Sequence, residues 1–168
     1  MKQITQTTQQ GTHLINKVNG VPIGRRYRQH YKNNIKLPDE IIQLLESFNI
    51  KWYSAFINCN GYIYLRLHRK NWFKAHQQIG LAKLLAIINS PYTIPEGLKL
   101  YALYKYETHH LNGNPLDNRL DNIIGFLTRL KHNQANHKTI QIYGKPNRRQ
   151  QINLYLFKYG VMEGATLE

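Results

Sequence analysis

The sequence predicts an α+β fold, in which short strands and helices follow one another along the chain. The strand signal is clearest in Tyr62 to Leu67, where side chains alternate in polarity directly after the turn residues Asn58 to Gly61. The helix signal is clearest near the C-terminus, where apolar side chains recur at i, i+3, i+4 and i+7. They are Ile152, Tyr155, Leu156 and Tyr159. No internal repeat is present.

Residues 1–36 are expected to form a basic, partly flexible N-terminal arm. Met1 to Gly24 shows no hydrophobic periodicity, and turn residues interrupt it. A basic and aromatic cluster follows, with no acidic residue before Asp39. Its arginines are Arg25, Arg26 and Arg28. Such an arm suits phosphate contacts, and the alternative is a solvated tail.

Residues 37–97 are expected to form a helix followed by a small sheet and a second helix. The predicted helices are Pro38 to Phe48 and His76 to Asn89. The predicted strands are Trp52 to Ile57, Tyr62 to Leu67 and Trp72 to Ala75. One face of the middle strand carries Tyr62, Tyr64 and Arg66. That face either binds a ligand such as DNA or is solvated support.

Residues 98–140 contain the candidate catalytic and metal-binding side chains. Ser90 to Gly97 is predicted to be a linker, and Leu98 to Tyr106 a strand that leads into the pair His109-His110. A loop rich in Asn, Gly, Pro and Asp precedes a second strand, Ile123 to Leu127. Thr128 is a plausible N-cap for a short helix that carries His132 and Asn136. A chain that folds back in this order can bring His109, His110 and His132 together.

Residues 141–168 are predicted to form a basic segment and an amphipathic helix. Thr139 to Tyr143 is expected to be a short strand, after which Gly144 and Pro146 break the chain. Arg148 and Arg149 then introduce the helix. Its apolar face docks either on the core or on DNA.

Composition points to a polyanionic partner. The chain of 168 residues has 23 Lys and Arg against 9 Asp and Glu, a net charge of +14. Nucleic acid is the favoured partner, because the basic residues are interleaved with Tyr, Asn and Gln. A single cysteine, Cys59, excludes an intrachain disulfide and fits a reducing compartment. We expect no membrane span and no secretory signal, and therefore an intracellular protein. The Asn, Lys, Ile and Tyr content indicates an AT-rich genome, such as that of a phage or an organelle, so the protein is expected in a phage host or an organelle.

The stretch from Glu107 to His137 resembles the HNH nuclease family. The resemblance covers about a fifth of the chain and rests on the His pair, the segment D-N-R-x-x-N-I from Asp117 to Ile123, and the ending T-x-x-x-H-N from Thr128. It implies a ββα-metal core that holds one divalent ion. The small sheet-helix modules of phage and intron-encoded endonucleases are similar in shape to residues 51–89.

The resemblance also implies roles for individual residues. His109 and His132 would be metal ligands, with Asn136 one helical turn further as an additional candidate. His110 would be the general base, a role that neutral imidazole can perform near pH 7. Asn122 would hold the loop and orient His110, with Asn118 as the alternative.

This chain departs from the family pattern at the metal site. Many relatives carry Asp at the position of His109, and some carry Cys pairs for a structural zinc that is missing here. Mg²⁺ is the first expectation, and the softer histidine ligands make Mn²⁺, Zn²⁺ or Ni²⁺ plausible.

The predicted function is a metal-dependent HNH endonuclease acting on double-stranded DNA, of the homing type, either intron-encoded or free-standing. The alternatives are a restriction, packaging or toxin nuclease of the same chemistry, and a non-catalytic basic nucleic-acid-binding protein. Candidate phosphate contacts near the site are Arg119, Arg129, Lys131 and Lys138. A monomer would favour nicking, whereas a homodimer could cut both strands.

Overall fold

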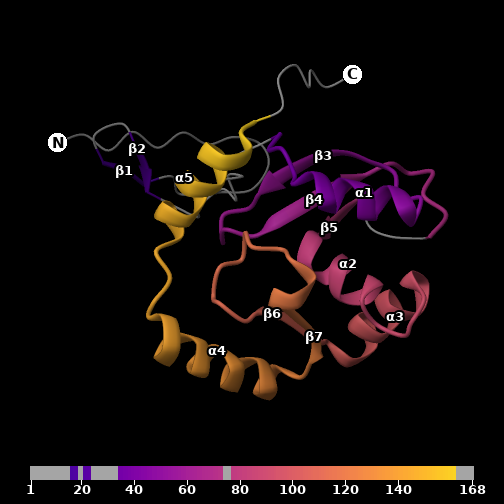
Figure 1. Cartoon of the computed structure of the whole chain (residues 1–168). Coiled ribbons are helices and arrows are strands. Elements are labelled where there is room, and N and C mark those ends of the chain that lie inside the picture. The colour runs from indigo at the N-terminus through magenta and orange to yellow at the C-terminus, as the bar shows by residue number, and fades with distance from the viewer. Residues whose placement is uncertain (1–15, 19–20, 24–33, 74–76, 162–168) are drawn as a thin grey trace.

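The protein has an α+β fold built from helices and small antiparallel sheets, as its sequence predicts (Figure 1). The structure is a computed structural model that describes residues 16–18, 21–23, 34–73 and 77–161. The predicted arm residues Arg25, Arg26 and Arg28 lie outside the described residues. Strands β1 (Asn16–Val18) and β2 (Val21–Ile23) pair antiparallel. No helix in the described part is long and apolar enough to cross a membrane.

The three-stranded sheet has the order β3-β4-β5. Strands β3 (Trp52–Ile57) and β4 (Ile63–Leu67) match the prediction and pair antiparallel. The turn between them is fixed by Asn58, whose side-chain oxygen accepts from the backbone N–H of Asn60 and of Tyr62 at 3.0 and 2.9 Å.

The third predicted strand, Trp72 to Ala75, is wrong over its first two residues, and Lys74 and Ala75 lie outside the described residues. Trp72 and Phe73 form a bend, and β5 comes later, at Gln78–Gly80. Tertiary contacts override the aromatic preference for strands, because Phe73 is buried and Trp72 Nε1 donates to the backbone oxygen of Phe48 at 3.0 Å. Helix α2 (Leu81–Ile88) accordingly starts five residues after the predicted His76.

Helix α1 (Asp39–Ser47) agrees with its predicted range. The predicted linker is correct for Ser90 to Thr93, whereas α3 (Ile94–Tyr104) replaces its second half and most of the predicted strand Leu98 to Tyr106. A capping box between Thr93 and Glu96 begins α3, and the left-handed residue Lys105 ends it. A Cβ on Gly97 would lie 2.4 Å from Ile87, so a small residue here lets α3 pack closely on α2.

Strands β6 (Glu107–His110) and β7 (Ile123–Leu127) pair antiparallel and are joined by a loop that includes the 3₁₀ turn Leu120–Asn122. Helix α4 (Arg129–Tyr143) follows, and it lies along the hairpin that β6 and β7 form (Figure 1). Thr128 is its N-cap, as expected, because its hydroxyl oxygen accepts from the Lys131 N–H at 3.4 Å.

The predicted strand Thr139 to Tyr143 is also wrong, because α4 continues through it. The β-branched residues favour a strand. Thr139 is nevertheless helical and buried, and its hydroxyl forms hydrogen bonds with the His109 ring and the Leu111 backbone oxygen. Local propensity is a weak preference that such tertiary contacts outweigh.

Helix α5 (Arg148–Tyr159) matches the predicted C-terminal helix. Its apolar face packs on the core, where Ile152 and Tyr155 are buried, and the Tyr155 hydroxyl donates to the Lys36 backbone oxygen at 2.8 Å. The alternative that this face binds DNA is therefore wrong, and only the outward face of α5 remains free for a partner.

Candidate functional site

The adjacent histidines of β6 are both buried, with 5% and 4% of their surface exposed for His109 and His110. Successive side chains in a strand point to opposite faces of the sheet. The two rings therefore have different neighbours: His109 lies against α4, and His110 lies against the β6–β7 loop.

His109 is positioned by Thr139. Its Nε2 lies 2.8 Å from the Thr139 hydroxyl, and that hydroxyl donates to the Leu111 backbone oxygen at 3.1 Å. Because the hydroxyl proton is used, the hydroxyl accepts from His109, which places the imidazole proton on Nε2. Burial, followed by the nearby His132, lowers the pKa of His109.

His132 reaches the same place from α4. The His109 and His132 ring centroids are 5.3 Å apart, with the planes at 73°. His132 Nδ1 lies 2.5 Å from the carboxylate of Glu107, so this nitrogen carries the proton and Nε2 keeps its lone pair. Glu107 was not predicted as a site residue, although it lies only two positions before His109 in the strand.

Two histidines, one from β6 and one from α4, face each other here. In the described part of the chain, no group of three or more His, Cys, Asp or Glu side chains has the arrangement of a metal site. The pair His109 and His132 nevertheless keeps one ring nitrogen each with no hydrogen bond to a described residue. Asn136, the additional candidate, is exposed on α4 and has no hydrogen bond to either histidine.

His110 is held by Asn118. Its Nε2 lies 3.2 Å from the Asn118 side-chain oxygen, whose amide nitrogen donates to the Pro115 backbone oxygen at 3.4 Å. The proton is therefore on Nε2 and the lone pair on Nδ1. Burial lowers the pKa of His110 to about 4, against an opposing hydrogen bond from Asn118, and His109 and Arg148 lower it further. His110 is a neutral base at pH 7.

The β6–β7 loop is held by amide side chains. Asn122 donates to the Asn112 side-chain oxygen at 3.0 Å and to the Asp117 backbone oxygen at 2.8 Å, and it accepts from the Asn112 N–H at 3.0 Å. The two tasks expected of Asn122 are thus divided: Asn122 bridges the loop, and Asn118 contacts His110. Arg119 is already paired with Asp117 at 2.9 Å within this loop.

Two residues from distant parts of the chain complete the surroundings of His110. The Tyr62 ring lies 6.1 Å from the His110 ring, and the Arg148 guanidinium lies 5.5 Å from the Tyr62 ring. Arg148 Nη1 is buried with no hydrogen-bond partner in the described part of the chain. A buried N–H group without a partner is costly and is often a ligand contact. The positive charge of Arg148 acts on His110 and contributes to its lowered pKa.

The remaining predicted nucleic-acid contacts are divided between covered and exposed positions. Tyr64 stacks on Phe56, and Arg66 lies over the same ring at 4.5 Å while it donates to the Ser54 hydroxyl at 3.1 Å. On the β4 face that was predicted to bind DNA, the side chains of Tyr64 and Arg66 therefore already contact other residues of the sheet. Among the predicted contacts on α4 and α5, Arg129, Lys131, Lys138 and Arg149 are exposed.

Comparison with known proteins gives no relative. No family model matches the chain, and neither a curated protein nor a solved structure matches it. The evidence on function is therefore the arrangement of the side chains around His109, His110 and His132.

Proposed function

We propose that the protein is a metal-dependent endonuclease of the HNH type, with β6, β7 and α4 as its ββα-metal core. The observation that carries the proposal is the neutral, buried His110, which Asn118 holds by one nitrogen and which directly follows His109 of the His109–His132 pair in β6. A buried base of lowered pKa that a neighbour orients, adjacent in the strand to a candidate metal ligand, supplies the groups that phosphodiester hydrolysis requires.

His110 performs the proton transfer in this proposal. Its Nδ1 lone pair accepts a proton from water while the water oxygen forms a bond to phosphorus and the bond to the leaving sugar oxygen breaks. Asn118 keeps the Nε2–H occupied, so the ring cannot rotate its lone pair away from the substrate. The low pKa of His110 keeps this nitrogen unprotonated through the neutral range.

His109 and His132 would hold the metal ion, with Mg²⁺ as the first expectation and Mn²⁺, Zn²⁺ or Ni²⁺ as alternatives. When bound, a divalent ion supplies positive charge that favours the charge developing on the phosphate and the leaving oxygen. Glu107 fixes the His132 ring through Nδ1, as carboxylates commonly do for metal-bound histidines. Thr139 does the same for His109.

The substrate is double-stranded DNA. Arg148 suits a phosphate near His110, because its positive charge already acts on that histidine. The exposed Arg129, Lys131 and Lys138 suit neighbouring phosphates, whereas Arg119 would first have to leave Asp117. Phosphate contacts position a protein on DNA without selecting a sequence. One argument favours a homing enzyme over a restriction, packaging or toxin nuclease. It is the resemblance in shape of residues 51–89 to the modules of phage and intron-encoded endonucleases.

A plasmid-nicking assay tests the proposal. Wild type with Mg²⁺, Mn²⁺, Zn²⁺ or Ni²⁺ should convert supercoiled plasmid to the nicked form, and EDTA should stop it. His110→Ala should lower the rate by about 10²–10⁴-fold and leave DNA affinity nearly unchanged, because proton transfer and phosphate binding are separate tasks. The exposed His68 provides the control variant His68→Ala, which should cleave normally.

The non-catalytic alternative makes the opposite prediction. A DNA-binding module on the same scaffold would bind plasmid with a strong salt dependence and cleave it with none of the four ions. That result, with a folded wild-type protein, would reject the nuclease proposal.

A further inference from the structure

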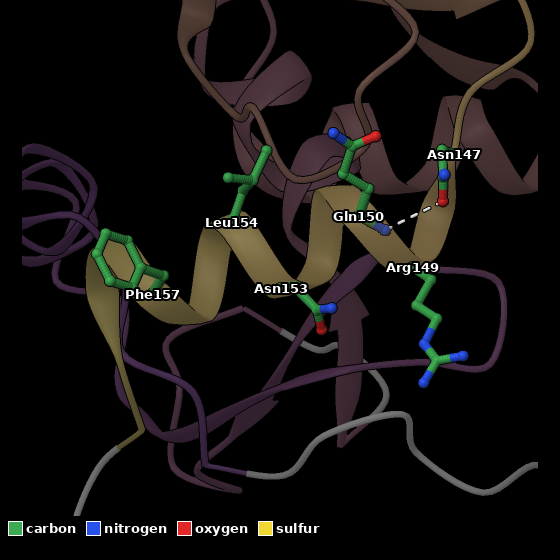
Figure 2. Close-up of a pocket in the computed structure, with 6 residues that line it drawn as sticks. All are labelled: Asn147, Arg149, Gln150, Asn153, Leu154 and Phe157. Carbon is green, nitrogen blue, oxygen red and sulfur yellow. Dashed lines mark hydrogen bonds between the residues drawn. The ribbon is translucent and has the colours of Figure 1, made fainter.

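Helix α5 has two faces with different roles. The inward face docks on the core through Ile152 and Tyr155. The outward face is exposed and forms a shallow hollow that is lined by residues of the helix and its cap (Figure 2). They are Asn147, Arg149, Gln150, Asn153, Leu154 and Phe157. The packed inward face holds the helix in a fixed position and so presents the outward face rigidly.

The apolar part of this outward face is unusually accessible. Leu154 is 60% exposed and Phe157 is 93% exposed. Asn147 is occupied as the N-cap, because its side-chain oxygen accepts from the Gln150 N–H at 3.1 Å. The side chains of Arg149, Gln150 and Asn153 have no hydrogen-bond partner in the described part of the chain, and helical spacing puts them on one surface.

The chain segment that contains α5 is strongly basic, and the acidic residues that act on the helix in space, Glu40 and Asp117, do so at Lys158 near its C-terminal end. No Asp or Glu occurs between Asp121 and Glu163, although this stretch contains seven basic residues. They are Arg129, Lys131, Lys138, Lys145, Arg148, Arg149 and Lys158. A helix in such surroundings is attracted to a polyanion, and it would be repelled by a second copy of the same basic surface. Charge complementarity therefore favours nucleic acid over a dimer.

We propose that the outward face of α5 enters the major groove of double-stranded DNA and recognises base edges there. Arg forms paired hydrogen bonds with guanine, Asn and Gln form them with adenine, and apolar side chains contact the thymine methyl group. Arg149, Gln150 and Asn153 supply the first two kinds of contact, and Leu154 and Phe157 supply the third. A helix of 12 residues spans about 18 Å, enough to cross the groove.

The position of α5 relative to the cleavage site supports this assignment. Arg148, the residue before Arg149, lies against Tyr62 beside His110. One helix therefore contacts the phosphate near His110 with its first residue and base edges with the following turns. The sheet face is a poorer candidate, because Tyr64 and Arg66 are engaged with Phe56. This inference rests on the proposed function only in taking DNA as the substrate.

Selection from a random-sequence DNA library tests the inference without requiring cleavage. Wild type should enrich a sequence motif. The variant Arg149→Ala/Gln150→Ala/Asn153→Ala should lose about tenfold or more in discrimination for each motif position that these residues contact. An unchanged motif in the variant, or no motif in wild type, would overturn the inference.

A second measurement isolates the apolar contact. Replacing thymine by uracil at the selected positions removes only the methyl group, so it should weaken binding by wild type and have less effect on Leu154→Ala and Phe157→Ala. Leu103→Ala is the matched control, since Leu103 is 64% exposed on α3. Sedimentation gives the competing outcome: a wild-type dimer that both variants dissociate, with the motif retained, would make this face a dimer interface and reject the proposal.

The two proposals can fail separately. In one outcome, wild type cleaves with no ion but enriches a motif that the triple variant loses; the nuclease proposal then fails and the recognition helix stands. In the other, wild type nicks plasmid and the triple variant retains the motif; the nuclease proposal then stands and the recognition helix fails.

Discussion

The sheet β3-β4-β5 and the β6–β7 hairpin with its loop are built by opposite means. The sheet region buries apolar side chains completely, as with Ile57 and Leu65 at 0% exposure. The hairpin region buries polar ones: among the described residues, every buried polar residue except Ser54 belongs to this hairpin, its loop or α4. They are His109, His110, Asn118, Asn122 and Thr139.

The sheet provides structural support, whereas the hairpin region carries the candidate catalytic groups. Burying a polar group costs free energy unless hydrogen bonds replace those to water, so a region that buries five of them is poorly optimised for stability. Their hydrogen bonds with one another make the arrangement rigid. Substitutions in the hairpin should therefore affect activity most, and substitutions in the sheet should affect stability most.

Removing a metal ligand should give the largest effect on activity. His132→Ala takes away one of only two histidines that face each other, so cleavage and metal affinity should both fall by about 100-fold or more. Glu107→Gln keeps the size of the carboxylate but weakens its contact with His132, and its loss should be about 10–100-fold. Calorimetry with Mn²⁺ or Zn²⁺ measures both, and unchanged affinity in His132→Ala would exclude this pair as the metal site.

Truncating the sheet core should give the largest effect on stability. Leu65→Ala leaves a cavity in the middle strand and should lower the free energy of unfolding by about 2–5 kcal/mol. The nicking rate per folded molecule should change little. Urea unfolding and an active-site titration measure the two quantities, and a parallel fall in both would mean that the sheet shapes the site directly.

Acid should destabilise the hairpin region through His110. Its pKa is about 4 when folded and near 6.5 when unfolded, so below about pH 6.5 the unfolded chain binds the proton first. The contribution is complete above that pH and is lost as the pH falls towards 4, at about 3 kcal/mol in all. Chemical unfolding across this range should show a flatter pH dependence in His110→Gln. An equally steep dependence in that variant would assign the effect to other groups.

Sequence reasoning succeeded where a residue's role depends on local spacing. The positions of β3, β4, α1 and α5 follow from short-range patterns. Helix α3 was missed because alternating Leu and Tyr residues resemble a strand, although Thr93 and Glu96 already form a capping-box pattern. The approach of Arg148 to Tyr62 could not be predicted, because it joins segments more than eighty residues apart that only the packing of α5 brings together.

The different roles of Asn118 and Asn122 could not be predicted either, because both amides belong to one short loop and only its folded path decides their partners.

Variants of these two asparagines should give the smallest effects and the sharpest test of the contrast between structural support and catalysis. Asn122→Ala leaves buried loop groups unpaired and should cost about 1–3 kcal/mol of stability. Asn118→Ala frees the His110 ring, so it should lower the nicking rate more than its effect on stability explains. Thermal unfolding and single-turnover nicking of both variants separate the two roles. If Asn118→Ala changed only stability, His110 would be oriented by its packing against Tyr62 and not by the amide.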